Sequence, residues 1–433
     1  MFTRASHVTN KVELLAPAGN FEKLETAIHF GADAVYIGGK DFSLRSHSGN
    51  FTIPEMADAA AYAHERGVKV YAACNVYARN NEKTAIYRHL EEVVQTGADA
   101  VIIADPGIFM AAREVAPDQV LHISTQANTT SVLSAAFWAA QGAVRINAAR
   151  ELPLSEIREI VESVPIEVEA FVHGAMCVAY SGRCLLSHYL AGRDANRGAC
   201  AHACRWKYRL EEETRPGRYL PVEEDRRGSY FFSARDLCMI DYIPEMIETG
   251  IASLKIEGRM KGLNYLACAV GTYRRAIDAY YADPKTYGVD ETWRESLETI
   301  NFRGYSTGFY TGDPSGPAPA YDGRTKTDKH RYIGKVLRKT SERAIETLIK
   351  NRIAKNDSVE IVGTGTPARK NRIQRIATDS NADAPAAQPN MHATLVLENS
   401  DPCRFGDIIR SLAAAGNTAG KTCCKKGKKP ATA

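Results

Sequence analysis

Five of the ten cysteines lie between residues 177 and 238, where their thiols could bind a metal or carry out redox chemistry. They are Cys177, Cys184, Cys200, Cys204 and Cys238. Structural zinc sites usually bring cysteines together in pairs about two to four residues apart, and only Cys200 and Cys204 are that close. An iron–sulfur cluster accepts thiolates from several separate loops. The spacing therefore favours an iron–sulfur cluster, with zinc and buried or redox-active thiols as the open alternatives.

The start of the chain, "MFTRASHVTNKVELLAPAGN", contains neither the apolar segment nor the cleavage site of a secretion signal. No stretch approaches the roughly 18 consecutive apolar residues of a membrane-spanning helix. We therefore expect a cytoplasmic protein without a membrane partner. Thiols stay reduced in the cytosol, so clustered cysteines there bind metal or take part in catalysis more often than they form disulfides.

Polar side chains follow several short segments rich in Val and Ile, at the points where strands would end. The candidate catalytic residues are Asn75, Gln126, His173 and Glu257, and Asp105, Asn128 and Asn147 occupy similar positions. Such groups suit substrate binding and proton transfer when they converge at one end of a sheet. Some of them could instead only cap a helix, and Asp105 and Asn20 are typical of such caps.

Four arginines lie near the same strand ends or within the cysteine-rich segment. They are Arg45, Arg150, Arg183 and Arg259. The guanidinium group binds a carboxylate through two parallel hydrogen bonds, so these residues are candidates for binding an anionic substrate. For each of them, a solvent-exposed arginine without a ligand is the alternative.

The short motifs of common hydrolases are missing from the sequence. The segment "HERGV" begins at His64 like a metalloprotease helix, but Val68 stands where the second histidine would be needed. Neither a G-x-S-x-G elbow nor a phosphate-binding P-loop occurs. No motif here therefore indicates hydrolysis.

One pattern repeats through about the first 260 residues: a short apolar segment, then a helical segment rich in Ala and charged residues. The apolar segments are "KVELLAP", "ADAVYIGG", "VKVYAACN", "ADAVIIADPG", "VLHISTQ", "AVRINAA", "IEVEAFVHG" and "IASLKIEG". Eight such units in this length predict an α/β fold, a (β/α)₈ TIM-type barrel. A doubly wound sheet is the alternative, but the first turn, "APAGNFEK", lacks its glycine-rich spacing. The cysteine-rich segment, about residues 174–240, would then be an insertion after the seventh strand.

The C-terminal part of the chain reads differently. Two helical segments complete a barrel domain over residues 1–311, and residues 312–328 are rich in Gly, Pro, Asp and Thr, as linkers are. Alternating segments such as "YIGKVLRK" and "ATLVLEN" predict a small all-β barrel domain over residues 329–410. Residues 329–377 contain 13 Lys and Arg against 4 Asp and Glu, although the whole chain has a net charge of only +4. We expect residues 411–433 to form a disordered basic tail.

Three segments together, "ELLAPAGNFEKLETAIHFGADAVYIGG", "CVAYSGRCLL…GACAHACRW" and "LKIEGRMKGLNY", resemble the collagenase-like peptidase family. Within it, the chain is most similar to the branch of bacterial tRNA hydroxylation proteins, and the resemblance covers nearly the whole chain. It implies a tRNA uridine 5-hydroxylase that converts the wobble uridine to 5-hydroxyuridine, depends on prephenate and carries a 4Fe-4S cluster. A peptidase, and an iron–sulfur hydroxylation scaffold in ubiquinone synthesis, are the alternatives.

The family pattern assigns the cluster ligands to Cys177, Cys184, Cys200 and Cys238, with Cys204 as the alternative to Cys200. An arginine near the cysteines would bind the two carboxylates of prephenate. The basic C-terminal domain would hold the RNA backbone, because Lys and Arg neutralise phosphates. The target base would have to be splayed out of the anticodon loop to reach a barrel mouth.

Overall fold

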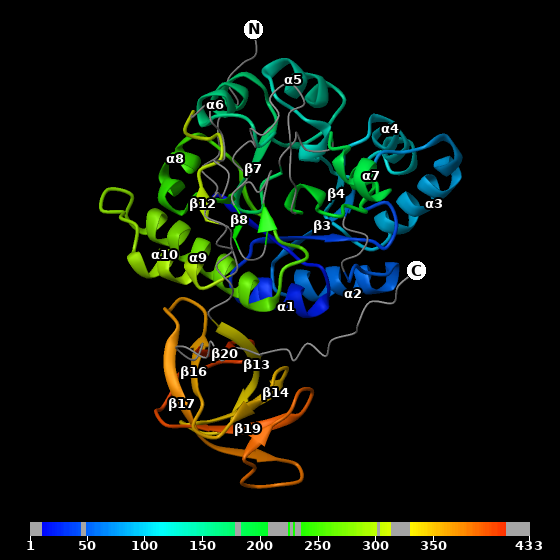
Figure 1. Ribbon diagram of the computed structural model, residues 1–433. Helices are drawn as coiled ribbons and strands as arrows, with labels where there is room; N and C mark the ends of the chain where they lie inside the picture. The colour runs from blue at the N-terminus through cyan, green and yellow to red at the C-terminus, as the bar shows by residue number, and fades with distance from the viewer. Residues whose placement is uncertain are drawn as a thin grey trace, which may run out of the picture.

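The computed structural model describes residues 11–44, 49–177, 183–206, 224–225, 228–229, 235–300, 304–312 and 330–412 (Figure 1). An eight-stranded parallel barrel, ringed by helices, contains the first part of the chain. A separate six-stranded barrel follows it, drawn in orange below the first in Figure 1. Both predicted barrels are thus confirmed. In the described part of the chain, no helix is long and apolar enough to span a membrane.

The eight parallel strands pair in chain order, and the last closes the barrel by pairing with both the first and the seventh. They are β1 (Glu13–Pro17), β2 (Ala34–Gly38), β3 (Lys69–Cys74), β4 (Ala100–Ile103), β5 (Leu121–Ile123), β6 (Arg145–Asn147), β7 (Glu167–Gly174) and β11 (Ser253–Ile256). Each falls within one of the eight apolar segments of the sequence. Their carboxyl ends therefore share one face of the barrel, as in other barrels of this type.

The helices alternate with these strands. They are α1 (Phe21–His29), α2 (Ile53–His64), α3 (Lys83–Val94), α4 (Pro106–Val115), α5 (Val132–Ala140), α6 (Leu154–Ser163), α8 (Ile243–Glu248), α9 (Leu263–Ala282) and α10 (Glu291–Glu298). Two of them begin at caps that the sequence predicted. The Asn20 side chain accepts a hydrogen bond from the Lys23 amide, and Asp105 accepts two from the first turn of α4.

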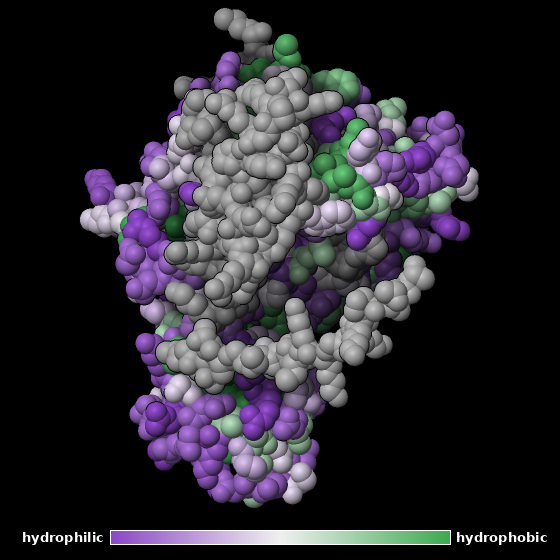
Figure 2. Space-filling view, viewed as in Figure 1, coloured by the Kyte–Doolittle hydropathy of each residue, from purple (hydrophilic) through white to green (hydrophobic). Residues whose placement is uncertain are grey.

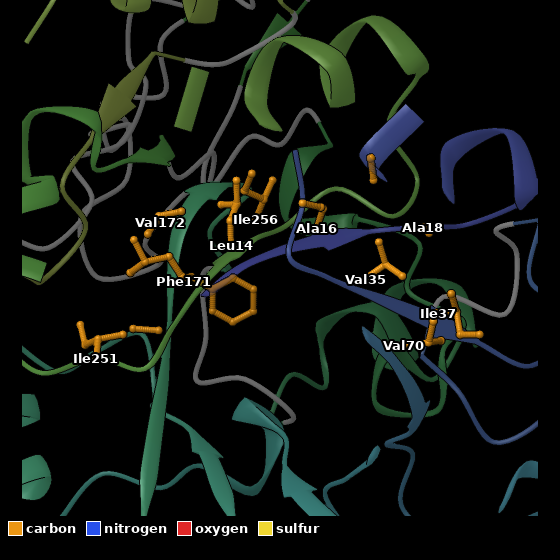
Figure 3. Packing of buried hydrophobic residues seen from close by; sticks show 14 of the residues in the cluster. Leu14, Ala16, Ala18, Val35, Ile37, Val70, Phe171, Val172, Ile251 and Ile256 are labelled. Carbon is orange, nitrogen blue, oxygen red and sulfur yellow. The ribbon is translucent and has the colours of Figure 1, made fainter. Parts of the chain in front are cut away.

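Every second residue of each barrel strand faces the helices, and these residues form the main apolar core. Figure 3 shows part of it, with Leu14 and Ala16 of β1 near Val35 and Ile37 of β2. The residues between them face the barrel interior, where a smaller apolar cluster includes Leu15, Tyr36 and Tyr71. The interior also contains charged side chains, which form part of the site described below.

The long insertion between β7 and β11 contains the cysteines, as predicted. It includes α7 (Leu186–Ala191), the 3₁₀ turns η3 (Ala195–Arg197) and η4 (Ala203–Arg205), β8 (Glu224–Asp225), β9 (Gly228–Ser229), β10 (Asp236–Cys238) and the 3₁₀ turn η5 (Ile240–Tyr242). Strand β10 pairs antiparallel with the end of β7, so that Cys238 lies opposite His173. A short strand, β12 (Tyr305–Ser306), pairs with β10 on its other side.

The second barrel is antiparallel and closed. Its strands are β13 (His330–Lys339), β14 (Ala344–Ile349), β16 (Ser358–Val362), β17 (Arg369–Thr378), β19 (His392–Leu397) and β20 (Ile408–Leu412). Two further short strands, β15 (Ile353–Ala354) and β18 (Ala386–Ala387), pair with each other. Strand β20 had no counterpart among the predicted segments, and it closes the barrel between β13 and β16. Residues 313–329 and 413–433, which contain most of the predicted linker and tail, lie outside the described residues.

Buried polar contacts hold the two barrels together. Arg410 of β20 donates two hydrogen bonds to Glu360, of 2.8 and 3.0 Å, and a third of 2.9 Å to the Thr299 hydroxyl beside α10. At α1, Lys335 pairs with Glu25 at 2.7 Å. The bonds to Thr299 and Glu25 thus join the second barrel to the end of α10 and to α1.

Candidate active site

A cavity of about 360 Å³ opens at the carboxyl ends of the barrel strands. This is the face on which enzymes of this fold build their sites, and the size falls in the usual range for small-molecule ligands. Part of its wall is apolar and is formed by Tyr36, Ile102, Phe171 and Met176. Residues of the cysteine-rich insertion form another part of the wall.

Three of the four candidate catalytic residues line this cavity: Asn75, Gln126 and Glu257. The Asn75 amide oxygen accepts a hydrogen bond of 3.2 Å from the Leu44 backbone. The Glu257 carboxylate lies 3.3 Å from the Tyr36 hydroxyl, which donates to it. The Gln126 side-chain oxygen is buried and has no hydrogen-bond partner among the described residues, so it is available to accept a bond from a ligand.

His173, the fourth candidate, lies outside the cavity lining. A β-bulge in β7 places Phe171 opposite Lys255 but His173 opposite Ile256, which shifts the alternation of side chains by one residue. The imidazole is therefore packed against the rings of Tyr265, Tyr273 and Tyr305. Burial there lowers the pKa of His173 to about 3, so the ring stays neutral at physiological pH.

The four candidate arginines separate in a similar way. Arg150 and Arg259 line the cavity. Arg150 donates a 2.7 Å hydrogen bond to the Ala175 carbonyl, and its guanidinium lies 3.8 Å from the centre of the Phe171 ring. Arg183 is exposed and does not line the cavity, and Arg45 lies outside the described residues.

Lys255 is a cavity residue that the sequence analysis did not identify. Its ammonium group lies 2.7 Å from the Glu169 carboxylate, and the Asn147 amide donates to the same oxygen at 2.7 Å. Below this pair, Arg145 binds Glu13 at 2.6 Å inside the barrel. A charged residue within the otherwise apolar segment "IASLKIEG" was the available signal, because such a residue in a buried strand points to an interior polar site.

Burial alone would raise the pKa of the Glu13 carboxyl. The charge of Arg145, together with hydrogen bonds from Arg145, Tyr71 and Ser253, outweighs burial and lowers that pKa below its usual value. Glu13 is therefore ionised, and it balances Arg145 within the barrel.

The charges that border the cavity are mainly positive. Arg150, Lys255, Arg259 and Lys261 line it, against one carboxylate, that of Glu257, among the described lining residues. Glu169 balances Lys255 from below, which leaves an excess of positive charge. A concave site with low-dielectric walls and an excess of one charge concentrates ligands of the opposite charge. The cavity is thus suited to an anionic ligand.

Four of the five clustered cysteines line the cavity. They are Cys177, Cys184, Cys200 and Cys204. The Cys200 sulfur accepts a 3.4 Å hydrogen bond from the His202 backbone amide. Cys238 does not line the cavity. Its sulfur lies 3.7 Å from the Tyr273 hydroxyl, and burial is the main cause that raises its pKa to about 11.

The donor set determines whether these residues fit a metal cofactor. Among the residues that the structure describes, no three Cys, His, Asp or Glu side chains converge closely enough to hold a metal ion. The donor chemistry fits a thiolate-bound cluster, because four thiols from separate turns border one cavity. Two other cysteines, Cys74 and Cys268, are buried in the core.

Comparison with known proteins identifies the family. Residues 19–318 match the model of peptidase family U32, and residues 328–410 match the model of that family's C-terminal domain. The chain belongs to peptidase family U32. The predicted resemblance is therefore confirmed.

Three relatives of this U32 protein carry two kinds of name. It is 40% identical to "tRNA hydroxylation protein P1" of Bacillus subtilis, over 88% of this chain and 90% of the relative. It is 35% identical to "tRNA hydroxylation protein P" of Escherichia coli, over 81% of this chain and 86% of the relative. It is also 31% identical to "Collagenase" of Porphyromonas gingivalis, over 76% of this chain and 80% of the relative. Family membership alone therefore does not distinguish hydroxylation from proteolysis.

The contacts of the cavity serine bear on this choice. The Ser124 hydroxyl lies 3.4 Å from the Asn75 amide nitrogen and 3.4 Å from the Gln126 backbone amide. Both groups donate to the serine oxygen, whereas a nucleophilic serine needs a base that accepts its proton. Within the described residues, Ser124 thus lacks the partner that peptide hydrolysis would require.

Proposed function

We propose that this U32 protein is an RNA-modifying enzyme that hydroxylates the wobble uridine of tRNA at carbon 5, with prephenate as co-substrate and a 4Fe-4S cluster as cofactor. The observation that carries the proposal is the cavity, where four cysteines and four cationic side chains surround one space. The relatives named for tRNA hydroxylation, which align over most of the chain, support the same activity.

The target base enters the cavity unstacked. A nucleobase held in an RNA loop cannot reach a barrel mouth, so it must be splayed out and held by new contacts. Tyr36 and Phe171 offer aromatic surface in the cavity wall. The unpartnered Gln126 oxygen accepts the N3–H of uracil, which relieves the cost of a buried acceptor without a partner.

Prephenate, a dicarboxylate, binds to the cationic part of the wall. Arg150 and Lys255 lie on neighbouring parts of that wall and flank the Phe171 ring, the first at 3.8 Å and the second at 5.7 Å from its centre. Glu169 fixes the Lys255 ammonium from below. A pre-positioned pair of cations loses little freedom when the carboxylates arrive.

The cluster is held by Cys177, Cys184 and Cys200, and it supplies redox equivalents when bound. Cys238 is the fourth ligand by the family resemblance, whereas Cys204 lines the same cavity as the other three. The backbone amide that donates to the Cys200 sulfur stabilises the thiolate that a ligand must present.

The deciding experiment is nucleoside mass spectrometry of tRNA. A strain that lacks the gene should lose 5-hydroxyuridine, and the wild-type chain should restore it. Protein purified without oxygen should contain about four irons and four sulfides per chain. Unchanged 5-hydroxyuridine in the deletion strain, or stoichiometric zinc without iron, would contradict the proposal.

A matched pair of cysteine variants identifies the fourth ligand. If the resemblance is right, Cys238→Ala loses iron and Cys204→Ala keeps it. If the cavity geometry decides, the outcomes are reversed. Cys184→Ala, which removes a ligand common to both schemes, should lose the cluster in either case.

A peptidase is the second candidate, and the similarity to the P. gingivalis collagenase favours it. It predicts that the purified chain cleaves gelatin and that the cleavage survives in Cys184→Ala. If the chain restores 5-hydroxyuridine in the deletion strain but does not cleave gelatin, peptidase activity is excluded and tRNA hydroxylation remains as the function.

A further inference from the structure

Apolar side chains gather on the outside of the cysteine-rich insertion. Residues 183–206, here called the α7 rim, include Leu185, Tyr189 and Trp206, which are 70%, 87% and 41% exposed. Figure 2 shows the hydrophobic surface over α7 beside strongly hydrophilic neighbours. Single exposed apolar residues are common, but a group that includes two aromatic rings on one short insertion indicates a binding surface.

The α7 rim is an ordered unit that borders the cavity. The Ser187 hydroxyl accepts a 2.8 Å hydrogen bond from the Ala201 amide, and Asn196 donates 3.1 Å to the Cys184 carbonyl. Arg197 ties the unit to the barrel through a 2.6 Å bond to the Tyr77 carbonyl. Residues of this same unit line the cavity, so a molecule bound on the rim would lie at its entrance.

The charge of the α7 rim identifies the chemistry of its partner. Residues 183–206 contain four arginines against one acidic residue, Asp194. Arg183 is exposed, with its guanidinium 5.9 Å from the centre of the Tyr77 ring. Exposed aromatic rings and arginines on one short segment match single-stranded RNA, whose bases stack on the rings while its phosphates lie near the cations.

We propose that the α7 rim binds the unpaired nucleotides next to the target uridine, with Tyr189 and Trp206 as stacking surfaces. This inference rests on the proposed function and extends it, because it identifies residues outside the cavity that select an RNA loop. Stacking tolerates any base, so the rim recognises an unpaired loop rather than a sequence. It also favours the splayed conformation, since the neighbours of the target keep a stacking partner on the protein.

The test uses an anticodon stem-loop RNA with 2-aminopurine directly 3′ of the target uridine. Binding to the wild type should quench its fluorescence. Tyr189→Ala should abolish the quenching and weaken binding roughly 5- to 100-fold, whereas Tyr189→Phe should behave like the wild type. Phe137→Ala, which removes an aromatic ring of 52% exposure on α5, is the matched control and should have no effect.

The outcomes separate the two proposals. If Tyr189→Ala and Trp206→Ala both bind and quench normally while cellular 5-hydroxyuridine is retained, the rim inference is overturned and the proposed function stands. If the wild type neither binds the stem-loop nor restores 5-hydroxyuridine, the proposed function fails. If Tyr189→Ala instead converts a dimer into a monomer in sedimentation, the rim is an interface between two copies, and the RNA inference is overturned.

Discussion

The two barrels place their charges on opposite sides of the sheet. The eight-stranded barrel encloses charged side chains, with Lys255 paired to Glu169 and Arg145 paired to Glu13 inside it. The core of the six-stranded barrel is almost entirely aliphatic, and includes Ile345 and Ile361. Cations without an ion-pair partner among the described residues lie outside instead, among them Lys370, Arg372 and Arg375 of β17.

The difference bears on the proposed ligands of the two barrels. An interior charge network is costly to desolvate and adds little net stability, so its presence points to a ligand that enters the barrel. An aliphatic interior adds stability and leaves the outer surface available. We infer that the first barrel binds a small anion inside, and that the second presents cations to a large polyanion outside.

The largest expected effect comes from breaking the interior network. Lys255→Met leaves the Glu169 carboxylate buried and without its closest cation, so we expect the free energy of unfolding to fall by about 3–5 kcal/mol. Urea denaturation measures this change. The paired change Lys255→Met with Glu169→Gln should recover part of the loss, because it also removes the stranded charge.

A volume-conserving change in the other barrel provides the contrast. Ile361→Leu should lower the free energy of unfolding by less than about 1.5 kcal/mol. If Lys255→Met lowered the free energy of unfolding as little as Ile361→Leu does, Lys255 and Glu169 would not be strongly coupled. The two barrel interiors would then not differ in the way proposed here.

The barrel itself could be predicted from sequence because each strand is a short apolar segment with Gly or a polar residue at its end. Such local patterns survive folding, as the caps at Asn20 and Asp105 show. Strand β20 was missed because it contains a buried charge, Arg410, whose partners come from other elements. A pattern within one segment cannot reveal a partner that folding brings from another.

The site was predictable only in part for a similar reason. Alternation along β7 puts His173 on the same side as Phe171, but the bulge reverses this, and its position depends on pairing with β11. The place of Cys238 depends on the pairing of β10 with β7, across the 61 residues from 175 to 235, which contain the other clustered cysteines. Residue types indicated the chemistry, whereas long-range strand pairing decided which side chains meet.

A smaller effect should separate the cavity arginines from the exposed one. Arg150→Lys keeps the charge but loses the forked contact, which is worth about 1.5–3 kcal/mol for a charged hydrogen bond. Prephenate affinity should therefore fall by roughly 10- to 100-fold. Arg183→Lys should leave it unchanged, since Arg183 does not line the cavity. Isothermal titration with prephenate, in the absence of RNA, measures the affinity of both variants. An equal loss of affinity in Arg150→Lys and Arg183→Lys would place the anion at the rim instead.

The smallest effect concerns the outer face of the second barrel. Among the described residues, six of its lysines and arginines, including Lys335 and Arg338, are engaged in ion pairs. On β17, Lys370, Arg372 and Arg375 are exposed and have no ion-pair partner among the residues that the structure describes. Figure 2 shows a continuous hydrophilic surface over this side of the barrel. These three residues place available cations on one strand, where they can contact RNA phosphates.

Each lost phosphate contact lowers the slope of log affinity against log salt by about 0.7–1. The double change Lys370→Gln with Arg372→Gln should accordingly reduce the slope for tRNA by about 1.5–2, with only a modest loss of affinity at low salt. The double change Arg338→Gln with Lys355→Gln removes the same charge from ion-paired positions and is the matched control. It should alter the slope less, because neighbouring carboxylates already neutralise those cations. If the two double variants change the salt slope of tRNA binding equally, net charge alone governs binding. The outer face of β17 then has no special role in holding tRNA.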